Sequence, residues 1–311
     1  MFAGRSLTIE LGVKKMAVGI DGGKIGERAA AAYLLRAKNR KKLMSLRVLQ
    51  RFITPVGGAA WCVVWVLGAL GAHAETTEPV AAAITANATV ISQYVSRGFR
   101  QTWGRPALQL GVDYGQPSGW SLGTWASTVS DRYIEDATVE WDLYGGYGGA
   151  AGGLGYSILG YYYKYPGAEY RATGTKYDYG ELSLGLTYGI AYAKYNHTVT
   201  RDFFGVTNAR GTGYLDLGTN LELGGGYTLN LHVGNGRLAG TGNAIWNWRD
   251  AKLGVSRAFN GGWSVSAAWT RAWGATDVYE HYTLGIPNRA GAIESSNPAA
   301  ATLVCALTKT F

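Results

Sequence analysis

Residues 86–311 contain about twelve segments of roughly ten residues in which apolar side chains alternate with small or polar ones. Such a segment has the length and the period of a tilted transmembrane strand, and single-chain bacterial barrels contain an even number of strands. The sequence therefore predicts an all-β fold, an antiparallel transmembrane β-barrel of about 12 strands. The expected strands lie near 86–96, 106–114, 120–129, 138–147, 154–164, 178–188, 190–200, 213–223, 227–235, 248–258, 263–273 and 301–311.

The connections between these segments alternate between short turns and long loops. Outer-membrane barrels have short periplasmic turns and long extracellular loops, whereas a soluble β-sandwich has no reason to sort its connections in this way. The short turns, rich in glycine, lie near 116–119, 150–153, 189, 224–226 and 260–262. The long loops lie near 97–105, 130–137, 165–177, 201–212, 236–247 and 274–300.

Aromatic residues at the turn ends of the strands indicate which strand face points outward. The alternation alone leaves this open: Leu182 and Leu184 alternate with Glu181 and Ser183, and a soluble barrel would hide the leucines that a membrane barrel turns to lipid. Amphipathic rings gather at the membrane interface, so we expect the rings on the leucine face to form a periplasmic girdle. This girdle comprises Tyr114, Trp120, Tyr147, Tyr188, Tyr227, Phe259 and Trp263.

The last segment of the chain ends on Phe311, and its alternation predicts the strand that closes the barrel. An unpaired strand edge is too costly to exist in lipid, so we expect this strand to be paired on both sides. A terminal aromatic residue also resembles the assembly signal of outer-membrane barrels, which makes the barrel assembly machinery an expected partner. Lys309 departs from the pattern, because an apolar residue would suit the lipid face better.

The first 74 residues differ from the rest of the chain in charge. They hold twelve of the 29 Lys and Arg but three of the 21 acids, which is +9; because the whole chain carries +8, residues 75–311 carry −1. The basic balance belongs to the leader and gives no reason to expect a nucleic-acid partner. Residues 44–74 predict a secretory signal peptide, with a small-x-small cleavage site before Glu75. We expect residues 1–43 to be a misassigned start or a disordered extension, and residues 75–311 to form the barrel.

Few residues of the chain point to chemistry. An outer-membrane hydrolase would need Ser, His and a polar orienting group together. We expect His232 to face the lumen and His197 to face the membrane interface, while His281 lies in a long loop. Cys305 is alone after the leader, which excludes an internal disulfide and a metal site built on cysteine. The prediction is therefore no enzymatic activity, no cofactor and no metal.

The polar faces of the strands predict an acidic lumen. Acidic side chains in a confined pore favour cations, so we expect a cation preference. An alternative is that Arg97, Arg100 or Arg105 folds inward and neutralises the carboxylates in a rigid network. The long loop 274–300 could cover the pore, bind calcium weakly, or be a solvated extracellular loop. The pore-lining candidates are seven acids and two bases, namely Asp113, Glu140, Asp142, Glu181, Asp216, Glu222, Asp250, Lys194 and Lys252.

A series of short motifs spans residues 86–311. They are, in order, Ser92-Gln-Tyr94-Val-Ser-Arg97-Gly98, Pro106-Ala-Leu-Gln109, Gly119 with Gly123-Thr-Trp125-Ala-Ser127, Glu140-Trp-Asp142-Leu-Tyr144, Tyr163-Lys-Tyr165-Pro166-Gly167, Lys252-Leu-Gly254-Val-Ser256 and Thr310-Phe311. In these motifs the chain resembles the TorF family of proteobacterial outer-membrane porins. The resemblance implies a barrel fold and a porin role, and it implies no particular substrate.

The functional expectation is a bacterial outer-membrane porin for the passive diffusion of small polar solutes. Its expected partners are membrane lipids, lipopolysaccharide and the solutes themselves. The alternative is a filled barrel with a structural or surface-binding role and no channel activity, because smaller barrels fill their interiors with side chains.

Overall fold

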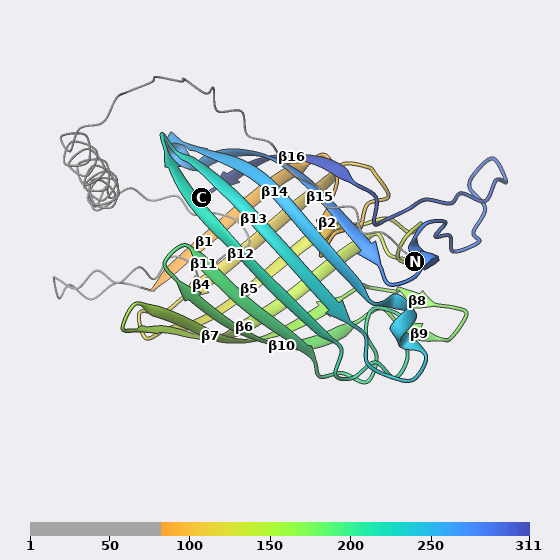
Figure 1. The fold of residues 1–311 in the computed structure, drawn as a ribbon. Coiled ribbons are helices and arrows are strands. Elements are labelled where there is room, and N and C mark those ends of the chain that lie inside the picture. The colour runs from red at the N-terminus through yellow and green to blue at the C-terminus, as the bar shows by residue number, and fades with distance from the viewer. Residues whose placement is uncertain (1–81) are drawn as a thin grey trace, which may run out of the picture. The chain divides into compact units, whose positions relative to one another are not determined.

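The computed structural model of the chain describes residues 82–311. Within this range twelve strands close into one antiparallel barrel, and two short hairpins and three short 3-10 helices lie in the connections (Figure 1). The predicted fold and strand number are therefore confirmed. The expected extension 1–43, the signal peptide 44–74 and the cleavage site before Glu75 lie outside the described residues.

The barrel follows an up-and-down order in which neighbouring barrel strands are hydrogen-bonded along the chain, and β1 closes the ring by pairing with both β16 and β4. Every barrel strand is thus paired on both sides, which leaves no free edge in the barrel. The barrel strands are β1 (Ala83–Ile91), β4 (Ala107–Gly115), β5 (Trp120–Thr128), β6 (Val139–Ala151), β7 (Leu154–Lys164), β10 (Tyr179–Tyr188), β11 (Ala191–Thr198), β12 (Gly213–Gly224), β13 (Tyr227–Arg237), β14 (Trp248–Phe259), β15 (Trp263–Gly274) and β16 (Thr302–Thr310).

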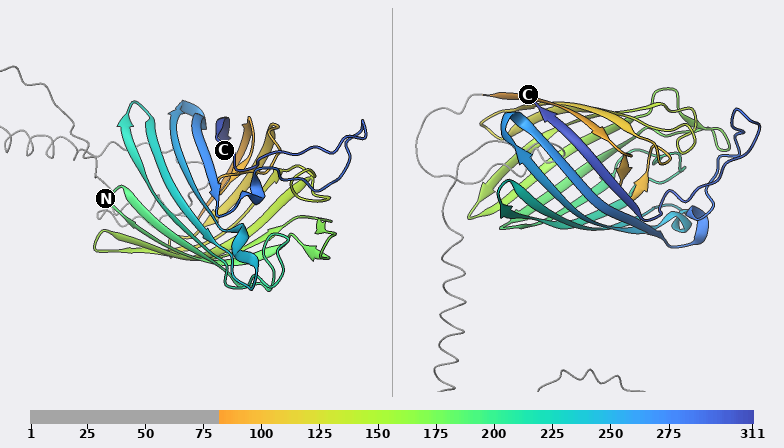
Figure 2. Two further views of the ribbon diagram at one scale, coloured as in Figure 1. Left: turned by 45° about the vertical axis from the view of Figure 1, so that its right-hand side comes forward. Right: turned by 90° about the horizontal axis from the view of Figure 1, so that it is seen from above.

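One end of the barrel carries the short turns and the other carries the long loops, as the sequence predicts (Figure 2). We call these the turn end and the loop end. The loop end holds the hairpins β2 (Val95–Ser96) with β3 (Phe99–Arg100) and β8 (Glu169–Tyr170) with β9 (Thr175–Lys176). It also holds the 3-10 helices η1 (Asn243–Trp246) and η3 (Asp277–Tyr279), whereas η2 (Asn260–Gly262) is a turn. No helix of the described residues is long and apolar enough to cross a membrane.

The first strand differs from its expected bounds. It ends at Ile91 rather than near residue 96. Ser92 makes the last contacts with β16: its backbone N–H donates to the carbonyl of Cys305, and its hydroxyl accepts from the backbone N–H of Cys305. The chain then turns at Arg97 and Gly98, which both adopt positive φ. Gly98 tolerates this conformation without strain, and a Cβ there would collide with Asp250 and Ala272 on the barrel wall.

The barrel is apolar outside and polar inside. Outward leucines stay exposed: on β10, Leu182 is 39% and Leu184 50% exposed, while Glu181 and Ser183, which alternate with them, are buried at 2% and 1%. This is the reverse of a soluble barrel, and it assigns the leucine face of each strand to the outside.

The one apolar core of the described residues lies at the loop end and is built mainly from connections. We call it the loop core: it includes Phe99, Tyr133, Ile134, Tyr165, Tyr177, Phe203 and Tyr279. These side chains come from five different connections, so the long loops fold together over the barrel mouth instead of extending separately into solvent.

Candidate functional site in the barrel lumen

The structure places the pore-lining candidates on the inward strand faces, between outward leucines and aromatic residues. They differ in burial. Asp113, Glu140, Asp142, Glu181 and Asp250 are buried. Lys194 and Asp216 are half-buried, whereas Glu222 near the turn end and Lys252 keep exposed side chains.

Residues 92–105, between β1 and β4, fold back into the lumen, and we call them the inner segment. The carbonyl of Arg97 accepts a hydrogen bond from Nε1 of Trp248 on the wall, at 3.1 Å. At the other side of the segment, the hydroxyl of Tyr94 donates to Oε1 of Glu140 at 3.3 Å. The backbone of Arg100 donates to the carbonyl of Pro298 at 2.9 Å, which ties the segment to the last long loop. The inner segment is therefore anchored to two sides of the wall and to a neighbouring loop.

The side chain of Arg97 reaches from β14 to β10 across the lumen. Its guanidinium donates to both carboxylate oxygens of Glu181, at 2.9 and 2.5 Å, and lies 4.6 Å from the ring centre of Tyr214. The Glu181 side chain is fully buried and that of Arg97 is 16% exposed. Burial alone would lower the pKa of Arg97, but the facing carboxylate outweighs burial and raises it, so this guanidinium keeps its charge.

The alternative of inward-folding arginines is thus correct for one residue. Arg97 pairs with a lumen carboxylate, as that alternative required. Arg100 instead donates to Ser296 and to the carbonyl of Asn297, and Arg105 is exposed. One guanidinium does not neutralise seven lumen carboxylates.

A second polar cluster surrounds His232 on the β12–β14 wall. The Nδ1 atom of His232 lies 2.7 Å from Oδ1 of Asp216, and its Nε2 atom lies 2.6 Å from Oδ2 of Asp250. The hydroxyl of Tyr214 donates to Asp250 at 3.0 Å. Gly234 lies between these groups, and a Cβ there would collide with the Asp250 carboxylate and the Tyr214 hydroxyl. The sequence indicates that His232 faces the lumen, but not that two carboxylates hold it.

The wall formed by β6, β7 and β10 presents a row of tyrosine rings to the lumen. Tyr144, Tyr161, Tyr163 and Tyr179 follow one another with ring centres 5.4, 5.9 and 4.4 Å apart. The Tyr144 hydroxyl donates to Asp113 at 2.5 Å. This wall carries tyrosines and carboxylates, whereas the lumen bases Lys194, His232 and Lys252 come from β11, β13 and β14. The lumen is therefore electrostatically asymmetric.

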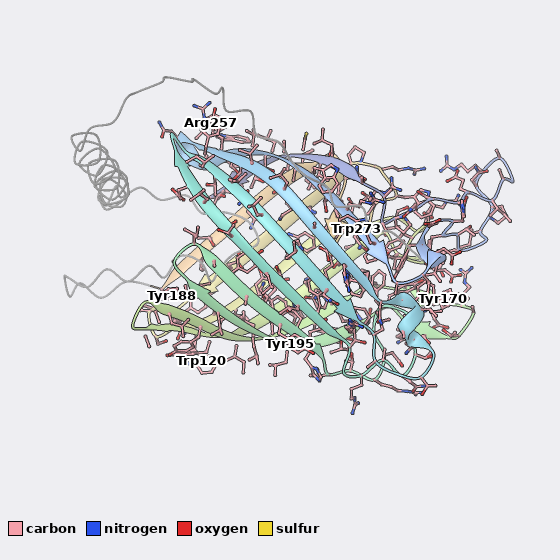
Figure 3. The ribbon with its side chains drawn as sticks, viewed as in Figure 1. Trp120, Tyr170, Tyr188, Tyr195, Arg257 and Trp273 are labelled. Atoms are coloured by element: carbon pink, nitrogen blue, oxygen red, sulfur yellow. The ribbon has the colours of Figure 1, made fainter. Side chains whose placement is uncertain are left out.

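The aromatic residues predicted as a girdle lie on the outer surface at the turn end, as Trp120 and Tyr188 illustrate in Figure 3. Six of the seven are exposed and Tyr147 is half-buried. Two cations lie among these rings. Arg257 contacts Tyr227 and Phe259, and the Lys309 ammonium donates to the Gly261 carbonyl beside Trp263 and Phe311. The Lys309 ammonium thus lies at the barrel rim instead of facing the middle of the apolar surface.

A second set of outward rings lies toward the loop end, and the sequence analysis missed it. Its members are Trp141, Tyr162, Tyr195, Trp269 and Trp273, of which Figure 3 labels Tyr195 and Trp273. All stand on the leucine face of strands. The same alternation that predicts the turn-end girdle, followed to the opposite strand ends, would have found them.

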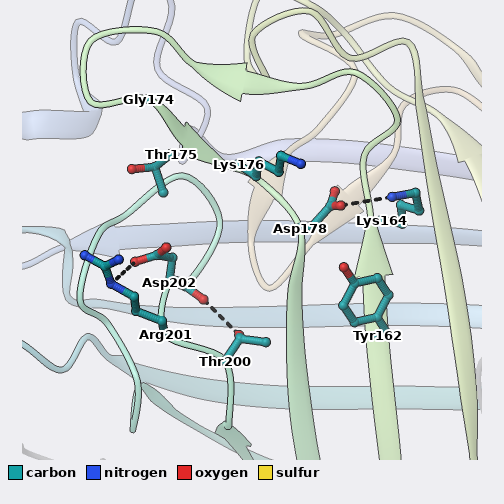
Figure 4. Close-up of a pocket in the computed structure, with 9 residues that line it drawn as sticks. All are labelled: Tyr162, Lys164, Gly174, Thr175, Lys176, Asp178, Thr200, Arg201 and Asp202. Carbon is teal, nitrogen blue, oxygen red and sulfur yellow. Dashed lines mark hydrogen bonds and ion pairs between the residues drawn. The ribbon is translucent and has the colours of Figure 1, made fainter.

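A surface pocket of about 400 Å³ lies at the loop end beside β7 and β10 (Figure 4). Two of its bases are already paired, since Lys164 lies 3.2 Å from Asp178 and Arg201 lies 3.8 Å from Asp202. Tyr162 contributes an outward ring. The pocket therefore belongs to the outer rim of the barrel and not to the lumen.

A Ser, a His and an orienting acid, as a hydrolase would need, do not come together in the described part of the chain. One Gly-x-Ser-x-Gly spacing exists, Gly119 to Gly123, but it forms a hairpin turn and the start of β5 rather than a strand-to-helix elbow. His197 points outward beside Tyr195. Within residues 82–311, no three His, Cys, Asp or Glu side chains are grouped so that they could hold a metal ion.

Residues 73–311 match the model of a protein family described as "Bacterial protein of unknown function (Gcw_chp)". The chain belongs to this family. No curated protein matches it. The resemblance to the TorF family stays a prediction.

Solved structures similar to this Gcw_chp protein include two porins and a FadL homologue. The KdgM porin matches with 6% identity and a TM-score of 0.45, over 73% of this chain and 98% of the porin. The NanC porin matches with 7% identity and a TM-score of 0.44, over 74% and 99%. A Pseudomonas aeruginosa FadL homologue matches with 11% identity and a TM-score of 0.35, over 74% and 89%.

Proposed function

We propose that the protein is a porin-like barrel of the bacterial outer membrane that lets small polar solutes diffuse through its lumen. The observation that carries this proposal is the inverted barrel: leucines and two sets of aromatic rings cover the outside, while carboxylates, amides and hydroxyls line the inside. The inward strand faces carry small polar side chains such as Ser183, Asn196 and Thr308, which suit a path for polar solutes.

The lumen charges support a preference for cations. Seven carboxylates face the interior, against Lys194, Lys252, the inward-folded Arg97 and His232. Acids therefore stay in excess even when the histidine is charged. Because fixed charges act strongly on ions in a confined, partly desolvated pore, this excess favours cations.

The inner segment limits the size of the solutes that can pass through the lumen. It occupies the loop-end half of the lumen, where Arg97 spans from β14 to Glu181 on β10. Solutes must pass beside this ion pair, so the proposed substrates are small and polar rather than long chains.

Single-channel recording in planar bilayers tests the proposal. Purified protein should give discrete conductance steps, and a salt gradient should give a reversal potential of cation-selective sign that shrinks as ionic strength rises. An anion-selective channel would contradict the proposal that the lumen carboxylates favour cations. The complete lack of conductance, in the wild type and in a variant without the Arg97 side chain, would remove the porin function.

The loop core favours a second candidate function, a closed barrel with a structural or surface-binding role. Its apolar side chains come from several loops and lie over the barrel mouth, and Ile134 and Ala209 have no exposed surface. Such a barrel would resist heat in detergent and bind ligands at its loops, yet give no conductance in the same bilayers.

The outer surface supports the proposed location and partners. The apolar outside with rings at both ends fits a bilayer, so membrane lipids contact the barrel, and lipopolysaccharide is the expected lipid at the loop end. Delivery would use the barrel assembly machinery. Separation of bacterial membranes on a density gradient tests the location: the protein should sediment with lipopolysaccharide and not with the inner membrane. No reaction is assigned to the protein.

A further inference from the structure

Two neighbouring lumen carboxylates lack the partners that the other buried ones have. Glu140 and Asp142 alternate on the inward face of β6 and are 2% and 8% exposed. Oε2 of Glu140 and Oδ1 of Asp142 are buried without a hydrogen-bond partner in the described structure. Two tyrosine hydroxyls reach Glu140: that of Tyr94 on the inner segment donates to its other oxygen at 3.3 Å, and that of Tyr165 in the loop core also hydrogen-bonds to this carboxylate.

The remaining buried carboxylates of the lumen all have strong donors. Arg97 holds Glu181, Tyr144 donates to Asp113, and His232 with Tyr214 holds Asp250. Burying a charged carboxylate is costly unless the charge is paired and hydrogen-bonded. The guanidinium nearest to the pair, that of Arg97, is already committed to Glu181 through two hydrogen bonds. The pair on β6 therefore lacks a cation of its own.

We propose that Glu140 and Asp142 bind one divalent hard cation of the calcium type at this point of the lumen wall. Every candidate ligand is an oxygen, from two carboxylates and the Tyr94 hydroxyl, and oxygen is the donor that calcium prefers. Two carboxylates neutralise a divalent ion, and water completes the coordination because no third acid or histidine joins them in the described residues. The ion links β6 to Tyr94 and so to the inner segment.

Calcium binding to the whole refolded barrel tests this site. Titration calorimetry should find one calcium per barrel, and calcium at roughly 100 times its dissociation constant should raise the unfolding midpoint by about 5 °C relative to sodium chloride of equal ionic strength. Both effects should disappear in Glu140→Gln and in Asp142→Asn. The matched control is Asp113→Asn, which removes a lumen carboxylate that already has a tyrosine donor and should leave both effects intact.

A second measurement needs no variant. Terbium in place of calcium should luminesce when Tyr94 or the neighbouring Trp125 is excited, because their rings lie 5.3 Å apart beside the pair, and calcium should displace it. The absence of both calcium binding and terbium emission overturns the proposal, as does calcium binding that both variants retain. A protonated carboxyl band in the infrared spectrum that vanishes in either variant would likewise overturn it, since a shared proton would then replace the ion. None of these outcomes depends on channel activity.

Discussion

Arg97 and Glu181 are 84 positions apart in the chain, yet the guanidinium of one donates two hydrogen bonds to the carboxylate of the other inside the lumen. The pair links a segment that follows the first strand to the wall at β10. Because the Glu181 side chain is fully buried, this guanidinium supplies the partner that a buried carboxylate needs. The ion pair therefore both narrows the lumen and holds the inner segment in place.

Replacing Arg97 with Ala should widen the lumen and destabilise the barrel. The change leaves the Glu181 carboxylate buried without its partner, which costs about 3 kcal/mol of unfolding free energy. It also removes the guanidinium that spans the lumen and one anchor of the inner segment, so single-channel conductance should rise. Urea unfolding in lipid vesicles measures the first effect, and planar bilayers measure the second.

Arg249→Ala provides the control for this prediction. Arg249 is an exposed arginine on β14, next to the Trp248 that anchors the inner segment. Its loss should change stability by about 0.5 kcal/mol or less and should not alter conductance. If Arg97→Ala behaves like Arg249→Ala in both assays, the ion pair neither constricts the lumen nor stabilises the barrel.

Replacing Gly234 with Ala should disturb the cluster around His232. A Cβ at this inward position of β13 would overlap the Asp250 carboxylate and the Tyr214 hydroxyl, and overpacking of this kind costs roughly 1–3 kcal/mol. Gly160→Ala on β7 is the matched control, because a Cβ there meets no atom within 4 Å. Equal unfolding midpoints for the two variants would contradict the close packing at Gly234.

Removing Phe311 should impair assembly. Its backbone N–H donates to the carbonyl of Ala86 at 2.9 Å, which extends the contact between the last and first strands, and its ring contacts the Lys309 ammonium. The truncated chain should give less heat-resistant barrel on unheated gels than the intact chain. Phe259→Ala removes a turn-end ring away from the terminus and should assemble normally. Equal loss in both variants would mean that girdle rings matter in general, not the terminal residue.

The sequence determined the barrel well because its two signals are periodic. The alternation of apolar and polar residues predicts where the strands lie, and the alternation of short turns and long loops predicts which end of each strand is at the turn end. The strand number and most strand bounds therefore agree with the structure. The bounds failed at the first strand, where residues 92–96 keep an alternating pattern yet leave the sheet. Alternation reports only local geometry, and long-range contacts with Trp248, Glu181 and Pro298 decide the path of this segment.

The lumen was predictable as a set of residues but not as a set of pairs. Alternation assigns Asp216, His232 and Asp250 to the same face, whereas their mutual contacts depend on strand stagger and on the gap at Gly234. The unpaired carboxylate oxygens of Glu140 and Asp142 could not be predicted either, because they depend on which neighbouring side chains carry hydrogen-bond donors. The sequence shows which charged residues face the lumen, but the pairing register of the strands decides which of these side chains contact one another.

Alkaline pH should open the loop core before it unfolds the strands. Burial raises the pKa of Tyr177 to about 12, above the ordinary value near 10, although a hydrogen bond with the backbone of Glu135 acts in the opposite direction. Burial also raises the pKa values of Tyr133 and Tyr165 in the same core well above the ordinary value. A raised folded-state pKa stabilises the protonated, folded form: this contribution is fully present below pH 10 and is lost as pH rises toward 12.

A two-unit shift corresponds to roughly 2–3 kcal/mol per tyrosine, so the loop core should loosen within this window. Phenolate absorbance should appear near pH 12 together with loss of near-ultraviolet circular dichroism, while the far-ultraviolet strand signal persists. Tyr177→Phe keeps the ring but removes the proton, so its transition should move to higher pH. Phenolate absorbance complete near pH 10, or the same transition in Tyr177→Phe, would show that ionisation of Tyr177 does not control the loop core.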